Sequence, residues 1–416
     1  MTGSYGSGSY GVGTYSVGLD GPTTAVPRAD YVVLFTDDDL VVLGDPIMCW
    51  TSLDITLKFN EPDSGMMIVP GYPWILDQIA PGNRVVVIRN QAILTSGPIE
   101  KWLHERSDDG ENAGYGKLTV NFADDSAKIA ARDVRPDPAQ TVEGQTVDNW
   151  TFTGTAEDAL RALVNLNAGP GALADRREPH LVLGAAAGIG AGITVTAQRM
   201  QPLGDVARKI AEVGGNLGFR TRQVGTQIEF QVYAPVDKSS TVRFGFALGN
   251  MKYVSYEVSA PTATVVEVGG QGDTGADAFM IERTNPTELL SWGRFEKLVS
   301  RAGTADLQVL QDDGDKALAE GAATTRLATN VADTPDQRFG RDYSVGDIVA
   351  VESWPGEQVV DLVRTVHLQI YATSGEYVSA TVGSQEATSD PEWIRRVREI
   401  DERLGQLERT VTVTRA

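Results

Sequence analysis

The chain has 416 residues, a formal net charge of −20 and a single cysteine, Cys49. This length divides into roughly two to four ordinary domains. The acidic excess argues against stable binding to nucleic acid or to an anionic membrane, because both need clustered Lys and Arg. One cysteine excludes an intrachain disulfide and leaves too few ligands for a Cys/His zinc site. No secretion signal is visible, and the longest weakly apolar stretch, 181–195, is too short to insert into a bilayer.

Residues 1–28 form a Gly/Ser/Tyr-rich segment in which Tyr5, Tyr10 and Tyr15 recur every five residues. Glycine makes such a backbone costly to order, and three tyrosines cannot build a core by themselves. We interpret the segment as an arm whose tyrosines dock on a neighbouring subunit. A flexible tail is the alternative interpretation.

Residues 29–140 are predicted to form a first antiparallel, barrel-like β domain. A turn at Pro81-Gly82-Asn83 precedes an apolar strand at 84–88. Another strand, at 52–59, alternates between apolar and polar residues, which indicates one buried face. Its apolar residues are Leu53, Ile55, Leu57 and Phe59.

Residues 141–235 are predicted to form a mixed α+β domain with two helices. Thr155 is placed to cap the first helix, with Asp158 three positions on as its partner. The second helix follows Pro202 and ends at Gly214. Strand-forming residues alternate again at 228–232.

Residues 236–385 are predicted to form a second barrel-like β domain, with a charged helix at 314–328. The turn at Gly346-Asp347 stands between strand-forming residues. We expect Gly346 to adopt a positive φ and Asp347 to accept hydrogen bonds from nearby backbone N–H groups.

Residues 386–416 carry an apolar seam at alternating spacings of four and three, which is typical of a coiled-coil helix. We expect this helix to mediate oligomerisation, whereas an amphipathic helix lying on its own domain is the alternative. The seam residues are Trp393, Val397, Ile400, Leu404, Leu407 and Val411.

No catalytic, cofactor-binding or metal site is expected from the sequence. The three histidines stand apart, and no nucleophile elbow, zinc-protease motif or phosphate loop is present. The pair Asp124-Asp125 could serve a glycosidase, but adjacent acids are expected by chance in so acidic a chain. Six tryptophans are assigned to the core because they lie in or beside apolar segments: Trp50, Trp74, Trp102, Trp150, Trp292 and Trp354.

Six short blocks follow one another along residues 31–383. They are Trp50-Thr51-Ser52-Leu53, Lys58-Phe59-Asn60, residues 82–89, Ser96-Gly97-Pro98-Ile99-Glu100, Trp292-Gly293-Arg294-Phe295-Glu296 and Tyr343-Ser344-Val345-Gly346-Asp347-Ile348-Val349. Their order resembles that in the tail-tip hub (baseplate hub, minor tail) proteins of long-tailed phages of actinobacteria, a family similar to the trimeric hub of contractile tails.

The resemblance implies a structural protein of the virion, made in the host cytoplasm and placed at the tail tip. It implies a homotrimer that closes the tail tube and lets DNA pass without binding it stably. The implied partners are the distal tail ring protein, the tape-measure protein and tail fibre or spike proteins. A tail-tip cell-wall hydrolase and a carbohydrate-binding receptor module are the two alternatives.

Overall fold

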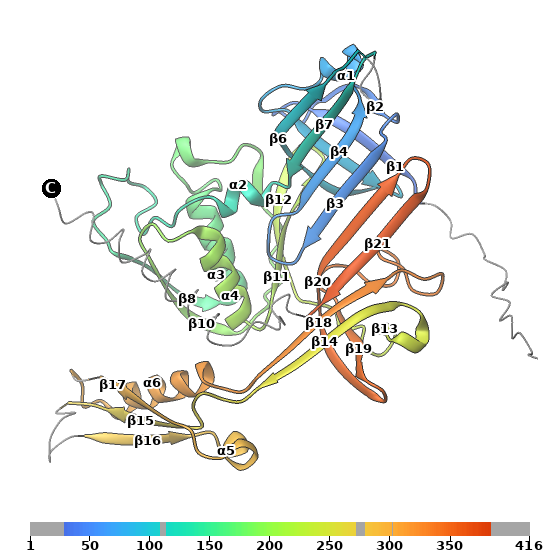
Figure 1. The fold of residues 1–416 in the computed structure, drawn as a ribbon. Helices are drawn as coiled ribbons and strands as arrows, with labels where there is room; N and C mark the ends of the chain where they lie inside the picture. The colour runs from blue at the N-terminus through green and yellow to red at the C-terminus, as the bar shows by residue number, and fades with distance from the viewer. Residues whose placement is uncertain (1–28, 109–113, 272–278, 302, 384–416) are drawn as a thin grey trace, which may run out of the picture.

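The computed structural model describes residues 29–108, 114–271, 279–301 and 303–383. Its largest element is a 13-stranded sheet to which two distant parts of the chain contribute (Figure 1). The first part supplies β1 (Tyr31–Thr36), β2 (Val42–Ile47), β3 (Ser52–Lys58), β4 (Ser64–Pro70), β5 (Arg84–Arg89), β6 (Ala92–Glu105) and β7 (Lys117–Ala123). The second part supplies β13 (Arg243–Phe244), β14 (Met251–Ser259), β18 (Thr324–Ala332), β19 (Ile348–Trp354), β20 (Glu357–Tyr371) and β21 (Gly375–Val382).

The two parts join where β3 pairs with β20 in antiparallel register, with Leu57 opposite Val366. The strand order is β14-β18-β21-β20-β3-β4-β7-β6-β5-β1-β2, with β19 and β13 branching from β20. Apolar residues at every second position of β3, as predicted, face one continuous core beneath the sheet.

The prediction of two barrel-like domains is wrong, because no sheet formed by the described strands closes into a barrel. β20 is 15 residues long and pairs with β3, β19 and β21, so it connects the two predicted β regions. Alternation identifies the buried face of a strand, but it does not identify the neighbour with which that strand pairs.

An α+β part lies beside the main sheet (Figure 1). It contains β8 (Asn149–Thr155), α3 (Ala156–Asn167), β9 (Leu181–Leu183), β10 (Gly192–Gln198), α4 (Leu203–Val213), β11 (Gly218–Val224) and β12 (Gln227–Tyr233). The predicted cap is confirmed, since Asp158 N–H donates to Thr155 Oγ1 at 3.2 Å. The second predicted helix is also confirmed, because α4 begins after Pro202 and has Gly214 as its C-cap. Both helices pack their apolar faces into a second core.

A small lobe extends from the main sheet on the ribbon formed by β14 and β18 (Figure 1). It contains β15 (Val265–Gly269), β16 (Met280–Thr284), α5 (Pro286–Trp292), β17 (Glu296–Ser300) and α6 (Leu307–Glu320). Its own core includes Val266, Val268 and Leu310. The predicted helix at 314–328 is displaced in the structure. Asp306 caps α6 earlier by accepting from Gln308 N–H at 2.9 Å, and residues 324–332 form β18.

The remaining short helices are α1 (Pro73–Leu76), α2 (Ser126–Ala130), η2 (Ala174–Arg176) and η3 (Phe246–Leu248). The turn before β19 confirms the sequence prediction. Gly346 has φ of 88°, and Asp347 Oδ2 accepts from Ser344 N–H at 2.7 Å. The same oxygen is 2.9 Å from Lys238 Nζ, which ties the turn to the segment leading from the α+β part.

Candidate functional site

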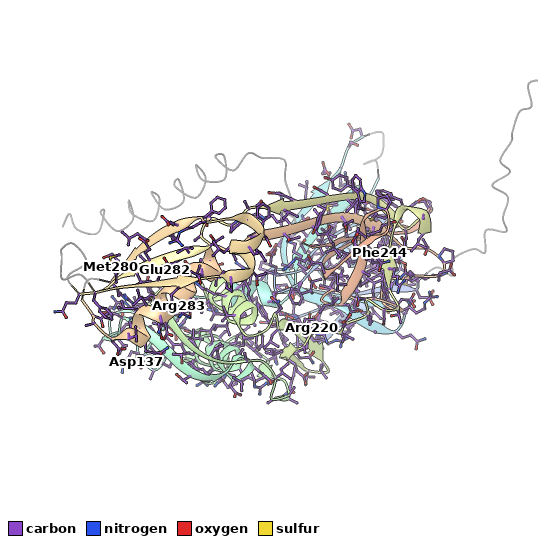
Figure 2. All side chains as sticks on the ribbon, turned by 90° about the horizontal axis from the view of Figure 1, so that it is seen from below. Asp137, Arg220, Phe244, Met280, Glu282 and Arg283 are labelled. Atoms are coloured by element: carbon purple, nitrogen blue, oxygen red, sulfur yellow. The ribbon has the colours of Figure 1, made fainter. Side chains whose placement is uncertain are left out.

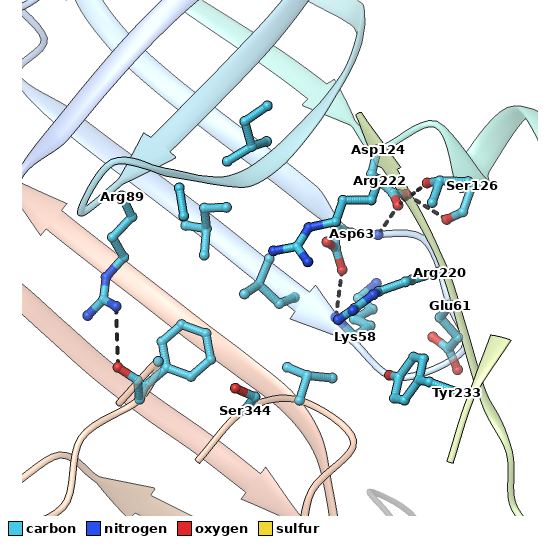
Figure 3. A pocket seen from close by; sticks show the side chains of 18 of the residues that line it. Lys58, Glu61, Asp63, Arg89, Asp124, Ser126, Arg220, Arg222, Tyr233 and Ser344 are labelled. Atoms are coloured by element: carbon cyan, nitrogen blue, oxygen red, sulfur yellow. Dashed lines mark hydrogen bonds between the residues drawn. The ribbon is translucent and has the colours of Figure 1, made fainter. Parts of the chain in front are cut away.

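A pocket of about 360 Å³ lies between the main sheet and β11 (Figure 3). Lys58 at the end of β3, Asp63 after it and Asp124 after β7 form one side. Arg220 and Arg222 from β11 form the facing side. This volume lies within the range of small-ligand pockets, and polar groups converge here from several elements.

Asp124 is the best-connected acid of the pocket. Its Oδ1 accepts from Ser126 Oγ at 2.6 Å and from Asp63 N–H at 3.1 Å, and its Oδ2 accepts from Thr221 Oγ1 at 3.0 Å. Burial raises the pKa of Asp124 to about 6, although the hydroxyl donors oppose the shift. The bond from Thr221 connects β11 directly to the end of β7.

Asp63 lies beside Asp124 and shares its environment. Burial and the negative charge of Asp124 raise the pKa of Asp63 well above its usual range. Its Oδ1 accepts from Lys58 N–H at 2.8 Å, which opposes that shift. Both carboxyls therefore bind a proton more tightly than an exposed aspartate does.

The cations of the pocket have few partners. The guanidinium of Arg220 lies 4.8 Å from the centre of the Tyr233 ring, and its Nε donates to Gln231 at 3.3 Å. Burial lowers the pKa of Arg220 and raises that of Tyr233 to about 12. Within the described residues, no ion pair joins Arg220, Arg222 or the Lys58 ammonium to a carboxylate.

Asp124 and Asp125 do not act as a pair. Asp125 instead forms a buried, bidentate ion pair with Arg84, with N–O distances of 2.5 and 2.7 Å. The geometry therefore makes Asp125 a structural link between β5 and α2, whereas Asp124 belongs to the pocket.

Every residue predicted to mediate oligomerisation or docking lies outside the described residues. These are Tyr5, Tyr10 and Tyr15 of the arm, and Trp393, Val397, Ile400, Leu404, Leu407 and Val411 of the heptad seam. The pocket itself was not predicted. Its residues come from six separate segments, and only the alternation of Arg220 and Arg222 on a strand gives a signal in the sequence.

The assignment of six tryptophans to the core is wrong for four of them. Trp50 and Trp150 are buried, but Trp74, Trp102, Trp292 and Trp354 are exposed. Trp74 stacks on Tyr72 with ring centres 6.5 Å apart, so part of this aromatic surface is ordered by its neighbours. An apolar neighbourhood in sequence does not bury a residue whose side chain points to the exposed face of its helix or strand.

Two further properties concern the described part of the chain as a whole. It contains no group of three or more His, Cys, Asp or Glu side chains placed to hold a metal ion. None of its helices has both the length and the apolar character needed to span a bilayer.

The fold is that of phage tail proteins. The 43 kDa tail protein of prophage MuSo2 from Shewanella oneidensis aligns with a TM-score of 0.50 at 11% identity, over 87% of this chain and 99% of that chain. Residues 32–384 match the sequence model of the Siphovirus ReqiPepy6 Gp37-like protein family. The chain belongs to this family. No curated protein matches it by sequence.

Two other solved structures show similarity at lower scores. The prophage tail protein gp18 from Listeria monocytogenes EGD-e has a TM-score of 0.48 at 11% identity, over 91% of this chain and 99% of that one. The tail protein from Neisseria meningitidis MC58 has a TM-score of 0.47 at 16% identity, over 85% and 97%.

Proposed function

We propose that this protein is a structural subunit of the phage tail tip, a homotrimeric hub that closes the tail tube, and that it is not an enzyme. The observation that carries the proposal is a fold shared with a phage tail protein over nearly the whole of both chains. Membership of a siphovirus protein family supports it.

Surfaces left uncovered by the single chain support a role in assembly. β2 and β14 are edge strands at the two ends of the main sheet, and such edges pair readily with other chains. The outlying lobe also exposes large apolar side chains. Leu290 on α5 is 89% exposed and Leu298 on β17 is 65% exposed. These side chains are available to contact a partner.

The proposed partners are two further copies of this chain, the distal tail ring and tape-measure proteins above, and fibre or spike proteins below. The heptad seam in 386–416 would hold the copies together at one end. The acidic net charge suits a channel through which DNA passes without adhering.

Light scattering of the full chain after size-exclusion chromatography tests the trimer. We expect three chains per particle and a weaker association for the double variant Ile400→Asp/Leu404→Asp. The matched control places Asp off the seam, in Arg398→Asp/Glu402→Asp, and should remain trimeric. A chain that is monomeric both when purified alone and when extracted from tails would contradict the hub proposal.

One observation favours a carbohydrate-binding receptor module as a second candidate. Trp74, Tyr72 and Tyr115 form an aromatic cluster in which Trp74 and Tyr115 are 44% and 57% exposed. Exposed aromatic faces of this kind stack on sugar rings. Sedimentation with purified host cell wall separates the two candidates. Binding that is lost in Trp74→Ala but kept in Trp354→Ala, a tryptophan exposed elsewhere, would favour the receptor module.

A further inference from the structure

The strand β11 has one unpaired edge, and that edge borders the pocket. In its sheet the order is β11-β12-β9, so β12 covers only one side of β11. Four consecutive residues, 219–222, line the pocket. Phe219 N–H points away from β12 and donates to Asn60 Oδ1 at 2.7 Å. By the alternation of an antiparallel strand, the N–H groups of Thr221 and Gln223 point the same way.

No hydrogen bond is formed by the Thr221 and Gln223 N–H groups within the described residues. An edge with free N–H groups in register can bind an extended peptide by adding it as a further strand. Asn60 already occupies the start of this edge, because its Nδ2 also donates to Leu217 O at 2.9 Å. An added strand would therefore pair beyond Phe219, beside the pocket.

The side chains facing the pocket indicate the chemistry of that peptide. Arg220 and Arg222 are two positions apart on β11 and therefore project from the same face. Lys58 stands across from them at the end of β3 (Figure 3). As described above, none of these three cations has a carboxylate as an ion-pair partner, although the chain as a whole carries a net charge of −20.

The acids of the pocket offset these cations only in part, through the electrostatic interaction of Asp63 with Lys58 and Arg220. Asp124 is held by three donors, Asp63 accepts from the Lys58 backbone, and Glu61 is exposed. Seen from below, Arg220 lies in the middle of the molecule, between the lobe that carries Arg283 and the sheet region that carries Phe244 (Figure 2).

We propose that this pocket docks an extended acidic peptide of a partner protein. The peptide main chain pairs with the free edge of β11, and carboxylates at alternate positions bind Arg220 and Arg222. Carboxylates two residues apart on an extended strand lie on one face, as the two arginines do. Leu57, Ile93 and Val345 line the same pocket and provide an apolar floor for a flanking side chain. A phosphate-bearing glycan would use the cations but not the strand edge, so the observations favour a peptide.

Fluorescence anisotropy with the full chain tests the proposal. The probe is a fluorescein-labelled octapeptide of alternating Glu and Val, used at low ionic strength. We expect saturable binding that weakens about tenfold or more in Arg220→Gln/Arg222→Gln, because charge-assisted hydrogen bonds are lost. The control Lys209→Gln/Lys316→Gln removes the same charge from exposed sites on α4 and α6 and should bind as the parent protein does.

A second probe separates the strand edge from the charge. N-methylation of alternate peptide bonds keeps every carboxylate but removes main-chain donors, and this probe should bind about tenfold more weakly or worse. Three results would overturn the proposal: no saturable binding of the first probe, equal binding by the arginine variant, or equal binding of both probes. Displacement of both probes by inorganic phosphate alone would identify a simple anion site instead.

Discussion

Replacing Asp124 by Asn should change how the stability of the protein depends on pH. Burial raises the pKa of this carboxyl from 3.8 to about 6, so the folded state binds its proton more tightly than the unfolded chain does. The stability linked to that proton is fully present below the unfolded pKa and is lost as the pH rises through the folded one. The relevant window therefore runs from about pH 4 to about pH 7.

The size of the effect follows from the shift. The pKa of Asp124 changes from 3.8 to about 6, and each pKa unit corresponds to about 1.4 kcal/mol. The pH-dependent contribution of Asp124 to the free energy of unfolding is therefore at most about 3 kcal/mol. Asn does not titrate, so the variant should lack this pH-dependent contribution. The charge of Asp124 also contributes to the raised pKa of Asp63, so its removal should lower the pKa of Asp63 and reduce the pH-dependent contribution of that residue as well.

Urea unfolding followed by tryptophan fluorescence, at several values from about pH 4 to pH 8, measures this difference. Relative to the parent protein, the variant should be least stable at low pH. The difference in the free energy of unfolding should then shift in favour of the variant by up to about 3 kcal/mol as the pH rises. Asp336→Asn at an exposed site is the control, and its free energy of unfolding should differ from that of the parent protein by the same amount at every pH. Parallel curves for Asp124→Asn and the parent protein would show that the buried environment does not perturb Asp124.

Four other changes test features of the chain. Asp125→Ala should lower the free energy of unfolding by about 3–5 kcal/mol, because it leaves the Arg84 charge buried without a partner, and Arg84→Met/Asp125→Leu should recover much of that loss in urea unfolding. Gly346→Val should cost about 1–3 kcal/mol through its positive φ, with a further clash because a Cβ there would lie 2.8 Å from the Tyr233 hydroxyl. Asp347→Asn keeps a side-chain acceptor for the turn, so we expect normal folding and infectivity, and lost infectivity of a folded variant would indicate a chemical role for the charge. Deletion of residues 1–18 should leave the melting temperature unchanged and reduce incorporation into tails, and unchanged tail assembly would contradict a docking role for the arm.

Sequence reasoning succeeded where the determinants are local. Thr155 and Asp158 are three residues apart, and the hydrogen bond between them needs only the start of a helix. Gly346 and Asp347 define their turn within four residues. The buried face of β3 follows from alternation alone.

The sequence predictions that were wrong depend on contacts between distant parts of the chain. Nothing near β3 in the sequence indicates that β20 pairs with it, so two barrels were predicted where one open sheet exists. The helix predicted at 314–328 is helical only as far as Glu320, because buried residues at every second position, including Leu327 and Val331, place the later part in the sheet. The pocket was not predicted because it forms only when β3, β7 and β11 come together in the folded chain.

The pairing of β3 with β20 also has a consequence for biosynthesis. Asp54 on β3 and its partner His367 on β20 are 313 residues apart in the chain. At roughly 5–20 residues per second, a ribosome needs about 15–60 s to supply the second strand after the first has emerged. Throughout that interval one edge of β3 stays unpaired and open to wrong partners. A chain that ends before Glu357 lacks β20, so it cannot complete the sheet and leaves this edge of β3 unpaired.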